Sequence, residues 1–378
     1  MSMELEQWRS EISALDNELL RLLNQRAELA LKVGESKKGS GLAVCDHTRE
    51  REVLERICSI NSGPLDDRAV VELFRAIIHE SRRIQVQTLE PTQAVEPTPA
   101  PIAPGRIAFQ GEPGAFSEEA AIKLLGDQIE LVPRPTFESL FDAITDKSAD
   151  YILAPIENSI AGFVHGSFDQ LPDSNLQIIA EVIIQISQYL IGCAGSSFDS
   201  IASVESHPVA LEQCRRFLEI NPQIRRIVAQ DTAGSVAEIV RAGDPSRAAI
   251  AGLRAVERYG GVVLREHLED SRENYTRFFL LASSPEPVVD ADKMSLIIEL
   301  PHQPGALHSA LEPFARSGID LLKIEGRPVK GRPWEYSFYL ELRGSDSDDV
   351  ASVLSELHRQ RVETKILGSY KAAAVPAS

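Results

Sequence analysis

Two cations lie on the apolar side of a predicted N-terminal helix. Arg26 falls between Leu22 and Leu29, where a charge is costly to bury unless an anion meets it. Lys37 follows 11 residues later, which at about 100° per residue brings it within about 20° of the same face. This spacing indicates a site for a small anion, although each residue taken singly could be a solvated helix charge.

Arg9 points to the same side but lies 17 residues before Arg26, or about 26 Å along the axis. One small ligand cannot touch both from the same helix, so Arg9 could instead reach the site of a partner chain. Several inward polar groups on three apolar-faced helices favour a common anion site over unrelated surface charges. The other members of the set are Asp46, Arg49 and Glu50 on a second predicted helix, and Ser81 and Gln85 on a third.

A second group of candidates is neutral and follows predicted strands in the middle of the chain, where α/β proteins commonly bind ligands. GEPGAFSEEAA (111–121) joins a strand to a helix whose N-terminus, with Ser117, could bind an anion. Ser117 as a plain helix N-cap is an equally good interpretation. PIENS (155–159) and ESHP (205–208) also end strands, and Gln213 follows on the next helix.

The segment NYTRF (274–278) begins the last strand of this region. Side chains alternate along a strand, so Thr276 and Phe278 share one face and Arg277 takes the other. Each of these segments is weak evidence for a site when taken alone. His207 in the ESHP segment could simply be a capped core histidine.

The elements that position the first group are helices. Apolar residues recur every three or four positions from Ile12 to Val33, and further helices are predicted over 46–60 and 66–86, so residues 1–88 form an all-α domain. The first helix, about 32 residues and about 48 Å long, carries a longer apolar stripe than two shorter helices can cover. We therefore expect an intertwined homodimer.

The rest of the chain divides at two breaks. Residues 89–105 hold five prolines and no apolar periodicity, which is typical of a linker. Residues 106–283 alternate short strands with helices, an α/β pattern long enough for two lobes with a cleft between them. After a second break at 283–293, residues 293–370 follow the order β-α-β-β-α-β of a ferredoxin-like α+β domain.

Charge and cysteine content limit the possible functions. The 39 basic and 56 acidic residues give a net charge of −17, a poor balance for coating nucleic acid or an anionic membrane. The acidic excess falls mainly in the middle domain, so a site for an anion there should use local neutral donors. Four cysteines without metal-ligand spacing predict reduced thiols in a cytoplasmic protein without zinc. The apolar stretch 176–195 is too polar and interrupted to span a membrane.

Residues 1–88 resemble the helical type of chorismate mutase, in WRSEISALDNELLRLLNQRAELALKVGESK, DHTRERE and LFRAIIHESRRIQ. The resemblance implies that chorismate, a dicarboxylate, rearranges to prephenate here without a nucleophile or proton transfer. Lys37 and Gln85 would donate to the ether oxygen and Glu50 would accept from the ring hydroxyl. The other implied site residues are Arg9 (from the partner subunit), Arg26, Arg49, Asp46 and Ser81.

The middle domain resembles prephenate dehydratase, in the ordered set GxxGxFS, PIENS, SHP…QC and TRF. The resemblance implies two lobes similar to a periplasmic binding protein, with prephenate between them. Prephenate loses CO₂ and its C4 hydroxyl to give phenylpyruvate, and Thr276 is the implied proton donor. Further implied site residues are Ser117, Glu157, Asn158, Ser206 and Gln213.

The last domain resembles an ACT domain, a small fold that binds amino acids at a subunit interface. In phenylalanine-regulated relatives two segments bind the amino acid across a dimer. Here they correspond to Gly305, Ala306, Leu307 and His308, and to Glu325, Arg327 and Pro328. Gly326 stands where the usual second motif has Ser, a change that removes a hydroxyl and loosens the backbone.

Together the three resemblances imply a bifunctional chorismate mutase–prephenate dehydratase of phenylalanine biosynthesis. Chorismate and prephenate would be its substrates and L-phenylalanine its feedback inhibitor, without a metal or organic cofactor. Two alternatives remain open. A non-catalytic amino-acid sensor would need neither the mutase residues nor the TRF segment, and a dehydratase preferring arogenate would differ only in substrate.

Overall fold

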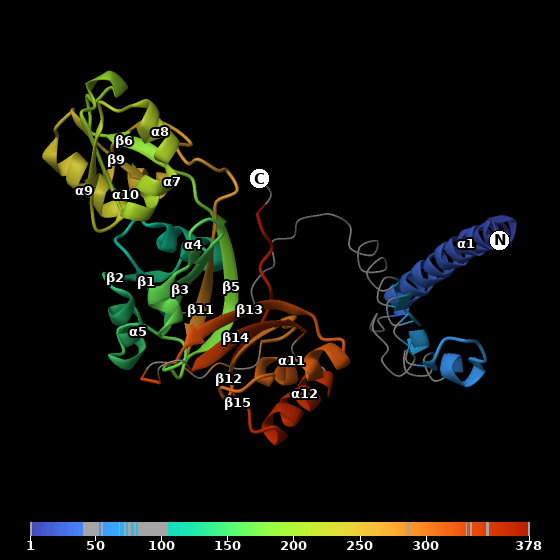
Figure 1. Ribbon diagram of the computed structural model, residues 1–378. Coiled ribbons are helices and arrows are strands. Elements are labelled where there is room, and N and C mark those ends of the chain that lie inside the picture. Colours follow the sequence, from blue (N-terminus) through green and yellow to red (C-terminus); the bar gives the residue numbers. More distant parts are fainter. Residues whose placement is uncertain are drawn as a thin grey trace. The chain divides into compact units, whose positions relative to one another are not determined.

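The computed structural model describes the backbone of residues 2–40, 53, 56–67, 69–71, 73–74, 77–78, 81, 105–283, 285, 288–329, 331–332, 335–344 and 348–376. Within the first of these segments, side chains are described for residues 7–9 and 11–33. The chain divides into two compact units, Met1–Glu96 and Pro97–Ser378. Figure 1 shows the elements of each unit.

The first unit is helical in its described part. Helix α1 (Ser2–Ser40) is 39 residues long. Helical residues recur at 56–60 and between 67 and 81. Asp66 caps the later segment, because its Oδ1 accepts from the backbone N–H of Ala69 at 2.7 Å.

The first lobe of the second unit is built on a mixed sheet of order β2-β1-β3-β11-β5, with β4 beside β3. Strands β5 and β11 run antiparallel to each other at its edge. One face packs against α4 and the other against α5 and α6. The elements are β1 (Arg106–Gln110), α4 (Phe116–Leu125), β2 (Glu130–Arg134), α5 (Phe137–Thr145), β3 (Tyr151–Asn158), β4 (Gly162–Phe163), α6 (His165–Phe168), β5 (Gln177–Gln185) and β11 (Tyr275–Ala282).

The second lobe holds a five-stranded sheet of order β10-β6-β9-β7-β8. Its elements are β6 (Tyr189–Gly192), η1 (Phe198–Ser200), β7 (Ser203–Ser206), α7 (Pro208–Gln213), α8 (Arg215–Ile220), β8 (Arg225–Val228), α9 (Thr232–Ala242), β9 (Arg247–Ala251), α10 (Leu253–Tyr259) and β10 (Val262–Arg265). The two sheets confirm the predicted two-lobed α/β pattern.

The helical segment that follows the ESHP motif is not one continuous helix. It is broken at Cys214, whose φ of −110° and ψ of 29° are not helical. Asp270 occupies the break, since its N–H donates to the Gln213 carbonyl at 2.7 Å and its carboxylate accepts from the Arg216 N–H at 3.0 Å. A partner distant in sequence therefore caps both halves.

Two segments cross between the lobes, one from β5 to β6 and one from β10 to β11. They run side by side, because Ile186 N–H donates to the Asn274 carbonyl at 2.7 Å and Leu268 N–H to the Gln188 carbonyl at 2.9 Å. The apolar stretch 176–195 is thus two strands and a crossover. Within the described residues, no helix has the length and apolar character needed to cross a membrane.

The last module has the predicted β-α-β-β-α-β order and a sheet of order β13-β14-β12-β15. Helices α11 and α12 cover one face. The other face shares a core with lobe 1, in which Tyr339 and Tyr370 pack with Phe279, so the module is not the separate body that its sequence suggests. The elements are β12 (Lys293–Glu299), α11 (Ala306–Arg316), β13 (Leu321–Pro328), β14 (Tyr336–Arg343), α12 (Asp348–Arg359) and β15 (Glu363–Tyr370).

Candidate active sites

The helical unit brings together two of its predicted site residues. The Arg26 guanidinium donates to the Ser81 hydroxyl and to the Ile77 carbonyl at 3.4 Å, and both Arg26 and Ser81 are half-buried. Arg9 is exposed on α1, and Lys37 lies in the same helix. The Lys37 side chain and the residues Asp46, Arg49, Glu50 and Gln85 lie outside the described residues.

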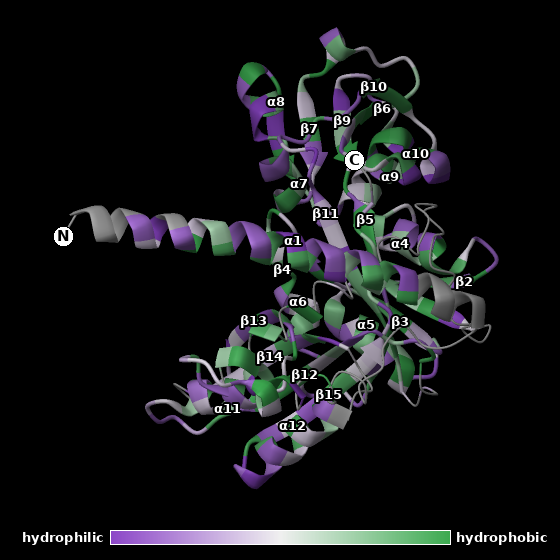
Figure 2. Cartoon of the chain, turned by 90° about the vertical axis from the view of Figure 1, so that its right-hand side faces the viewer, coloured by the Kyte–Doolittle hydropathy of each residue, from purple (hydrophilic) through white to green (hydrophobic). Residues whose placement is uncertain are grey.

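The apolar stripe of α1 is uncovered in the single chain. Leu15, Leu22 and Leu29 are 69%, 48% and 62% exposed, and Figure 2 shows hydrophobic and hydrophilic residues alternating along this helix. Contiguous apolar surface of this kind is costly to leave in water and is typical of an interface.

In the second unit, Asn158 and Thr276 meet at the ends of two paired strands. They are register partners between β3 and β11. Asn158 Nδ2 donates to Thr276 Oγ1 at 3.0 Å and to Asn274 Oδ1 at 2.7 Å. Because the Thr276 oxygen is the acceptor in this bond, its own hydrogen remains available for another acceptor.

The orientation of the Asn158 amide follows from its other partners. Its Oδ1 accepts from the backbone N–H groups of Ile160 at 3.1 Å and Ala161 at 2.8 Å. Backbone N–H groups can only donate, so the oxygen must face them and the NH₂ group must face Thr276. The turn after β3 therefore fixes the hydrogen-bonding role of the Thr276 hydroxyl.

Gln213 joins this cluster from the other lobe. Its Nε2 donates to Asn158 Oδ1 at 3.4 Å, and its Oε1 accepts from Gln188 Nε2 at 3.4 Å. Gln188 and Asn274, both buried, were not among the predicted site residues. Asn274 lies two residues before Thr276, at the start of the NYTRF segment, a position that could have suggested it, whereas Gln188 lies in an apolar stretch without any motif.

Both predicted serines are buried, and the hydroxyl of Ser206 is hydrogen-bonded within the protein. Ser206 is fully buried, and its hydroxyl donates to the Ile250 carbonyl at 2.6 Å. Ser117 is buried in the first turn of α4, where Ala115 is the N-cap, so the N-cap interpretation of Ser117 is wrong. The side chain of His207 does cap α7, by accepting from Val209 N–H at 3.3 Å.

The N-terminal turn of α4 already holds a carboxylate. Glu118 accepts from Gly114 N–H at 2.7 Å and forms a 3.2 Å ion pair with Arg254 of α10 in the second lobe. One donor of the expected anion site is thus satisfied internally, and the same carboxylate links the lobes.

Glu157 lies on the opposite face of the sheet from Thr276. Its carboxylate contacts Arg277 at 2.9 Å and Lys323 of the last module at 2.5 Å. The Arg277 guanidinium stacks over Phe279, 5.2 Å from the ring centroid. The structure therefore does not bring Glu157 together with Asn158 and Thr276.

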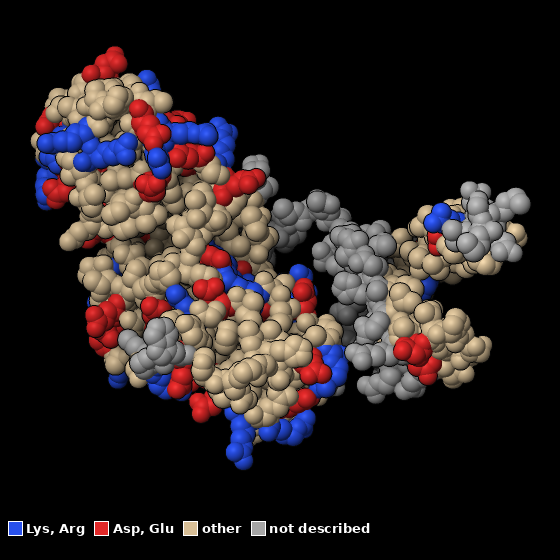
Figure 3. All heavy atoms as spheres, viewed as in Figure 1, with Lys and Arg blue, Asp and Glu red and all other residues tan. Residues whose placement is uncertain are grey.

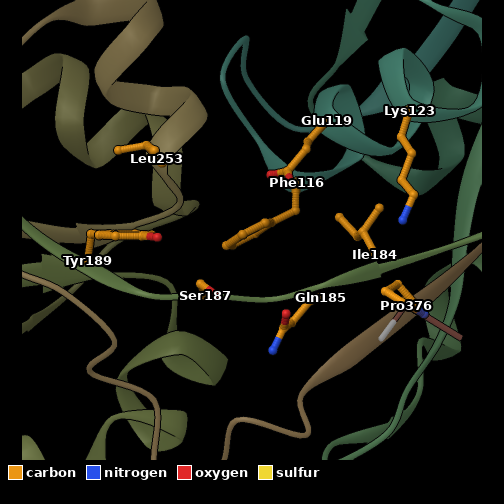
Figure 4. Close-up of a pocket in the computed structure, with 9 residues that line it drawn as sticks. All are labelled: Phe116, Glu119, Lys123, Ile184, Gln185, Ser187, Tyr189, Leu253 and Pro376. Carbon is orange, nitrogen blue, oxygen red and sulfur yellow. The ribbon is translucent and has the colours of Figure 1, made fainter. Parts of the chain in front are cut away.

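A cavity of about 360 Å³ lies between the lobes beside β5 (Figure 4). It is adjacent to the Asn158–Thr276 cluster rather than part of it, since Ile184, the register partner of Thr276, is one of its walls. Burial raises the pKa of Glu119 in its wall. The lining residues are Phe116, Glu119, Lys123, Ile184, Gln185, Ser187, Tyr189, Leu253 and Pro376.

The surface of the second unit carries charges of both signs. Figure 3 shows Lys and Arg interspersed with Asp and Glu over the visible face. The polar groups gathered around Thr276 are the uncharged amides of Asn158, Asn274 and Gln213.

The two predicted effector segments lie at the start of α11 and in the edge strand β13. Gly305 has a φ of +82° and precedes α11, which begins with Ala306 and Leu307, followed by an exposed His308. Glu325, Gly326, Arg327 and Pro328 end β13. The Arg327 guanidinium reaches lobe 1, where it bonds to His165, pairs with Asp169 at 3.6 Å and stacks over Phe168.

Comparison with known proteins identifies both catalytic regions. Residues 8–86 match the family model for chorismate mutase type II, and residues 107–286 match that for prephenate dehydratase. A bifunctional chorismate mutase/prephenate dehydratase of Aquifex aeolicus is 32% identical over 375 residues, 98% of each chain. The protein of the same name from Neisseria gonorrhoeae is 35% identical over 369 residues, 97% of each chain.

A solved structure resembles the second unit. Prephenate dehydratase from Arthrobacter aurescens, determined in complex with L-Phe, is 30% identical with a TM-score of 0.65. The match covers 72% of this chain and 93% of that chain.

Proposed function

Because the chain belongs to the bifunctional chorismate mutase/prephenate dehydratase family, we propose that it converts chorismate to phenylpyruvate through prephenate, at two separate sites, under feedback control by L-phenylalanine. The two activities follow from the family. The site residues, the regulation and the assembly are the proposal.

The main support for placing the dehydratase site at Thr276 is the hydrogen bond that the oriented Asn158 amide donates to Thr276 Oγ1. A threonine hydroxyl is too weak an acid to act through its pKa, so positioning must supply most of its effect. With the oxygen held as an acceptor, the hydroxyl hydrogen can point to the departing C4 hydroxyl of prephenate. That group leaves as water while the ring aromatises with loss of CO₂. Gln213, Ser117 and Ser206 are proposed to line the same site.

The mutase site is proposed to hold chorismate by its carboxylates. The planar guanidinium of arginine can donate two parallel hydrogen bonds to a carboxylate. Arg26 is held half-buried beside Ser81. Lys37 and Gln85 would stabilise the negative charge that develops on the ether oxygen, with Glu50 on the ring hydroxyl and Arg49 and Asp46 in support. A Lys37→Ala enzyme with normal mutase turnover would overturn this assignment.

A homodimer is proposed to complete the mutase site. The exposed apolar stripe of α1 supports it, and a partner's Arg9 would reach the anion that Arg26 binds.

L-phenylalanine is the proposed effector, supported by the L-Phe complex of the Arthrobacter relative and by the ferredoxin-like module. Its site would use the free N–H groups at the start of α11 and Glu325, Arg327 and Pro328 of β13. A serine at position 326 would place its Cβ 3.3 Å from the edge of the Phe338 ring, so the ring would have to shift slightly to admit it.

The test of regulation is dehydratase turnover with increasing L-phenylalanine, with L-alanine as the control amino acid. We expect inhibition by phenylalanine alone, and tighter inhibition in Gly326→Ser because the added hydroxyl is a further hydrogen-bonding group. Dehydratase turnover that phenylalanine leaves unchanged in both proteins would contradict the proposed regulation. Turnover of arogenate above that of prephenate would reassign the substrate.

A further inference from the structure

We propose that Lys323 is a positioning residue that couples the effector segment of β13 to the catalytic ends of β3 and β11, through Glu157 and Arg277. This inference rests on the proposed function, and it names the route by which the regulatory module would act on Thr276.

The route begins with the alternation of side chains along two paired strands. Asn158 pairs with Thr276, and Glu157 pairs with Arg277. The first pair meets on the catalytic face, and the second meets on the face that packs against the last module. Each catalytic residue is therefore joined by one peptide bond to a residue that contacts the regulatory module. A displacement of Glu157 or Arg277 on one face would move the backbone of Asn158 or Thr276 on the other.

The second face carries a buried ionic network that crosses from lobe 1 to the last module. Its cations and carboxylates balance three against three. Arg277 pairs with Glu341 at 2.8 Å, and Lys293 bridges Glu181 at 2.8 Å and Glu341 at 2.7 Å. The six residues are Arg277, Lys293, Lys323, Glu157, Glu181 and Glu341.

Burial makes the centre of this network intolerant of losing one member, whereas the Glu157 side chain at its margin is 32% exposed. The side chains of Arg277, Glu181 and Glu341 are 10%, 3% and 3% exposed. Removing one partner of a buried pair leaves an uncompensated charge, which costs far more than a surface pair would contribute. The surrounding groups must then rearrange, and Glu157 and Arg277 are the members directly next to the catalytic residues.

Lys323 is the member that a bound effector could move. It lies two residues before Glu325 in β13, its ammonium sits 4.1 Å from the centroid of the Phe163 ring, and its side chain is 15% exposed. Along the same strand Arg327 contacts Asp169. A shift of β13 on effector binding would pull on Glu157 directly, because Lys323 is its partner in the module.

The experiment compares three variants of the full chain. Lys323→Met keeps the length of the side chain but removes the charge, and Lys323→Arg keeps the charge. Lys365→Met is the matched control, because Lys365 also joins the module to lobe 1 but does so through backbone carbonyls, including that of Pro172 at 2.6 Å. L-phenylalanine binding is measured by equilibrium dialysis and dehydratase inhibition is measured separately.

We expect Lys323→Met to bind phenylalanine within about threefold of wild type but to need at least about tenfold more for half-inhibition, a change within the usual range of allosteric coupling. Lys323→Arg and Lys365→Met should be inhibited as wild type. Normal inhibition of Lys323→Met would overturn the proposal, and so would a loss of binding that matches the loss of inhibition.

A second measurement tests the coupling even if the wild type proves insensitive to phenylalanine, in which case only the proposed regulation fails. Hydrogen exchange of the unliganded full chain should be faster at residues 156–160 and 274–278 in Lys323→Met than in wild type or Lys365→Met. Unchanged exchange in these segments would overturn the coupling.

Discussion

At the scale of single residues, the proposed dehydratase site depends on which groups donate and which accept. Asn158 is held by two backbone donors and hence presents its NH₂ group to Thr276. This arrangement makes the hydroxyl more useful as a donor than its ordinary acidity suggests, because the cost of orienting it is met when the protein folds.

Thr276→Ala should lower dehydratase turnover by about 10²–10⁴-fold, the usual contribution of a positioned acid, and leave mutase turnover unchanged. Thr276→Ser keeps the hydroxyl and should retain more activity than the alanine variant. Both rates are measured on the same preparation. A parallel loss of both activities would indicate misfolding or a wrong assignment of the site.

Glu341 gives the network a predictable dependence on pH. Burial alone would raise its pKa, but Arg277 and Lys293 outweigh this and lower it to about 2, from an ordinary 4.5. A depressed carboxyl pKa stabilises the fold fully above the ordinary value and progressively less as the pH falls toward about 2. Between these values the free energy of unfolding should drop by about 1.4 kcal/mol per pH unit on account of this group.

Urea unfolding of wild type and Glu341→Gln at pH 5 and pH 3 checks this dependence. The variant should be less stable at pH 5, with a smaller loss on acidification than wild type. Equal losses in the two proteins would show that Glu341 titrates normally.

The residue scale also shows what sequence could and could not predict. Thr276, Asn158 and Gln213 were predicted as site residues, and their side chains are in contact. Glu157 came from the same PIENS motif, yet it faces the other way. A motif gives the order of residues but not the side of the sheet on which each side chain lies, nor which distant module covers that side.

At the scale of elements, the close approach of β15 to β5 controls how the module docks. Gly368 has a φ of +151°, and a Cβ there would lie 2.2 Å from the Ile178 carbonyl oxygen. Ile178 lies in β5, whose backbone is paired with β11 and cannot move aside easily, so the module itself would have to shift.

Gly368→Ala should therefore lower the free energy of unfolding of the second unit by about 1–3 kcal/mol or more. Gly344→Ala is the matched control, because Gly344 has a φ of +88° but nothing within 4 Å of the added Cβ, so it tests backbone strain without the clash. Urea unfolding compares the two. Equal destabilisation would show that the close approach does not matter.

Most elements followed from local patterns, and the exceptions have tertiary causes. Periodicity predicted the alternation of strands and helices over residues 106–283 and the order of the last module. It missed the break at Cys214, which depends on Asp270 from the interlobe crossover. It also gave no sign that the module shares a core with lobe 1. A buried face of a sheet has the same apolar pattern in the sequence whether a helix or another sheet packs against it.

At the scale of the whole molecule, the exposed stripe of α1 and the proposed homodimer predict that mutase activity depends on association. Leu15→Glu combined with Leu22→Glu places charges on that stripe and should separate the subunits through α1. Mutase turnover should fall by at least about 100-fold, because the partner's Arg9 would be lost. Dehydratase turnover should stay within about twofold.

Light scattering and the two assays on one preparation check this outcome. The surface substitution Glu28→Gln, on the same helix, is the control for charge changes on α1. Full mutase activity in a chain no longer associated through α1 would rule out a shared mutase site.

The central claim is that one chain carries chorismate through prephenate to phenylpyruvate, and a time course on the purified protein tests it most directly. Chorismate, prephenate and phenylpyruvate are separated and quantified after chorismate alone is added. We predict that prephenate rises and then falls as phenylpyruvate accumulates, and that prephenate becomes the end product in Thr276→Ala. Chorismate left unconsumed, or consumed without phenylpyruvate in the wild type, would contradict the account.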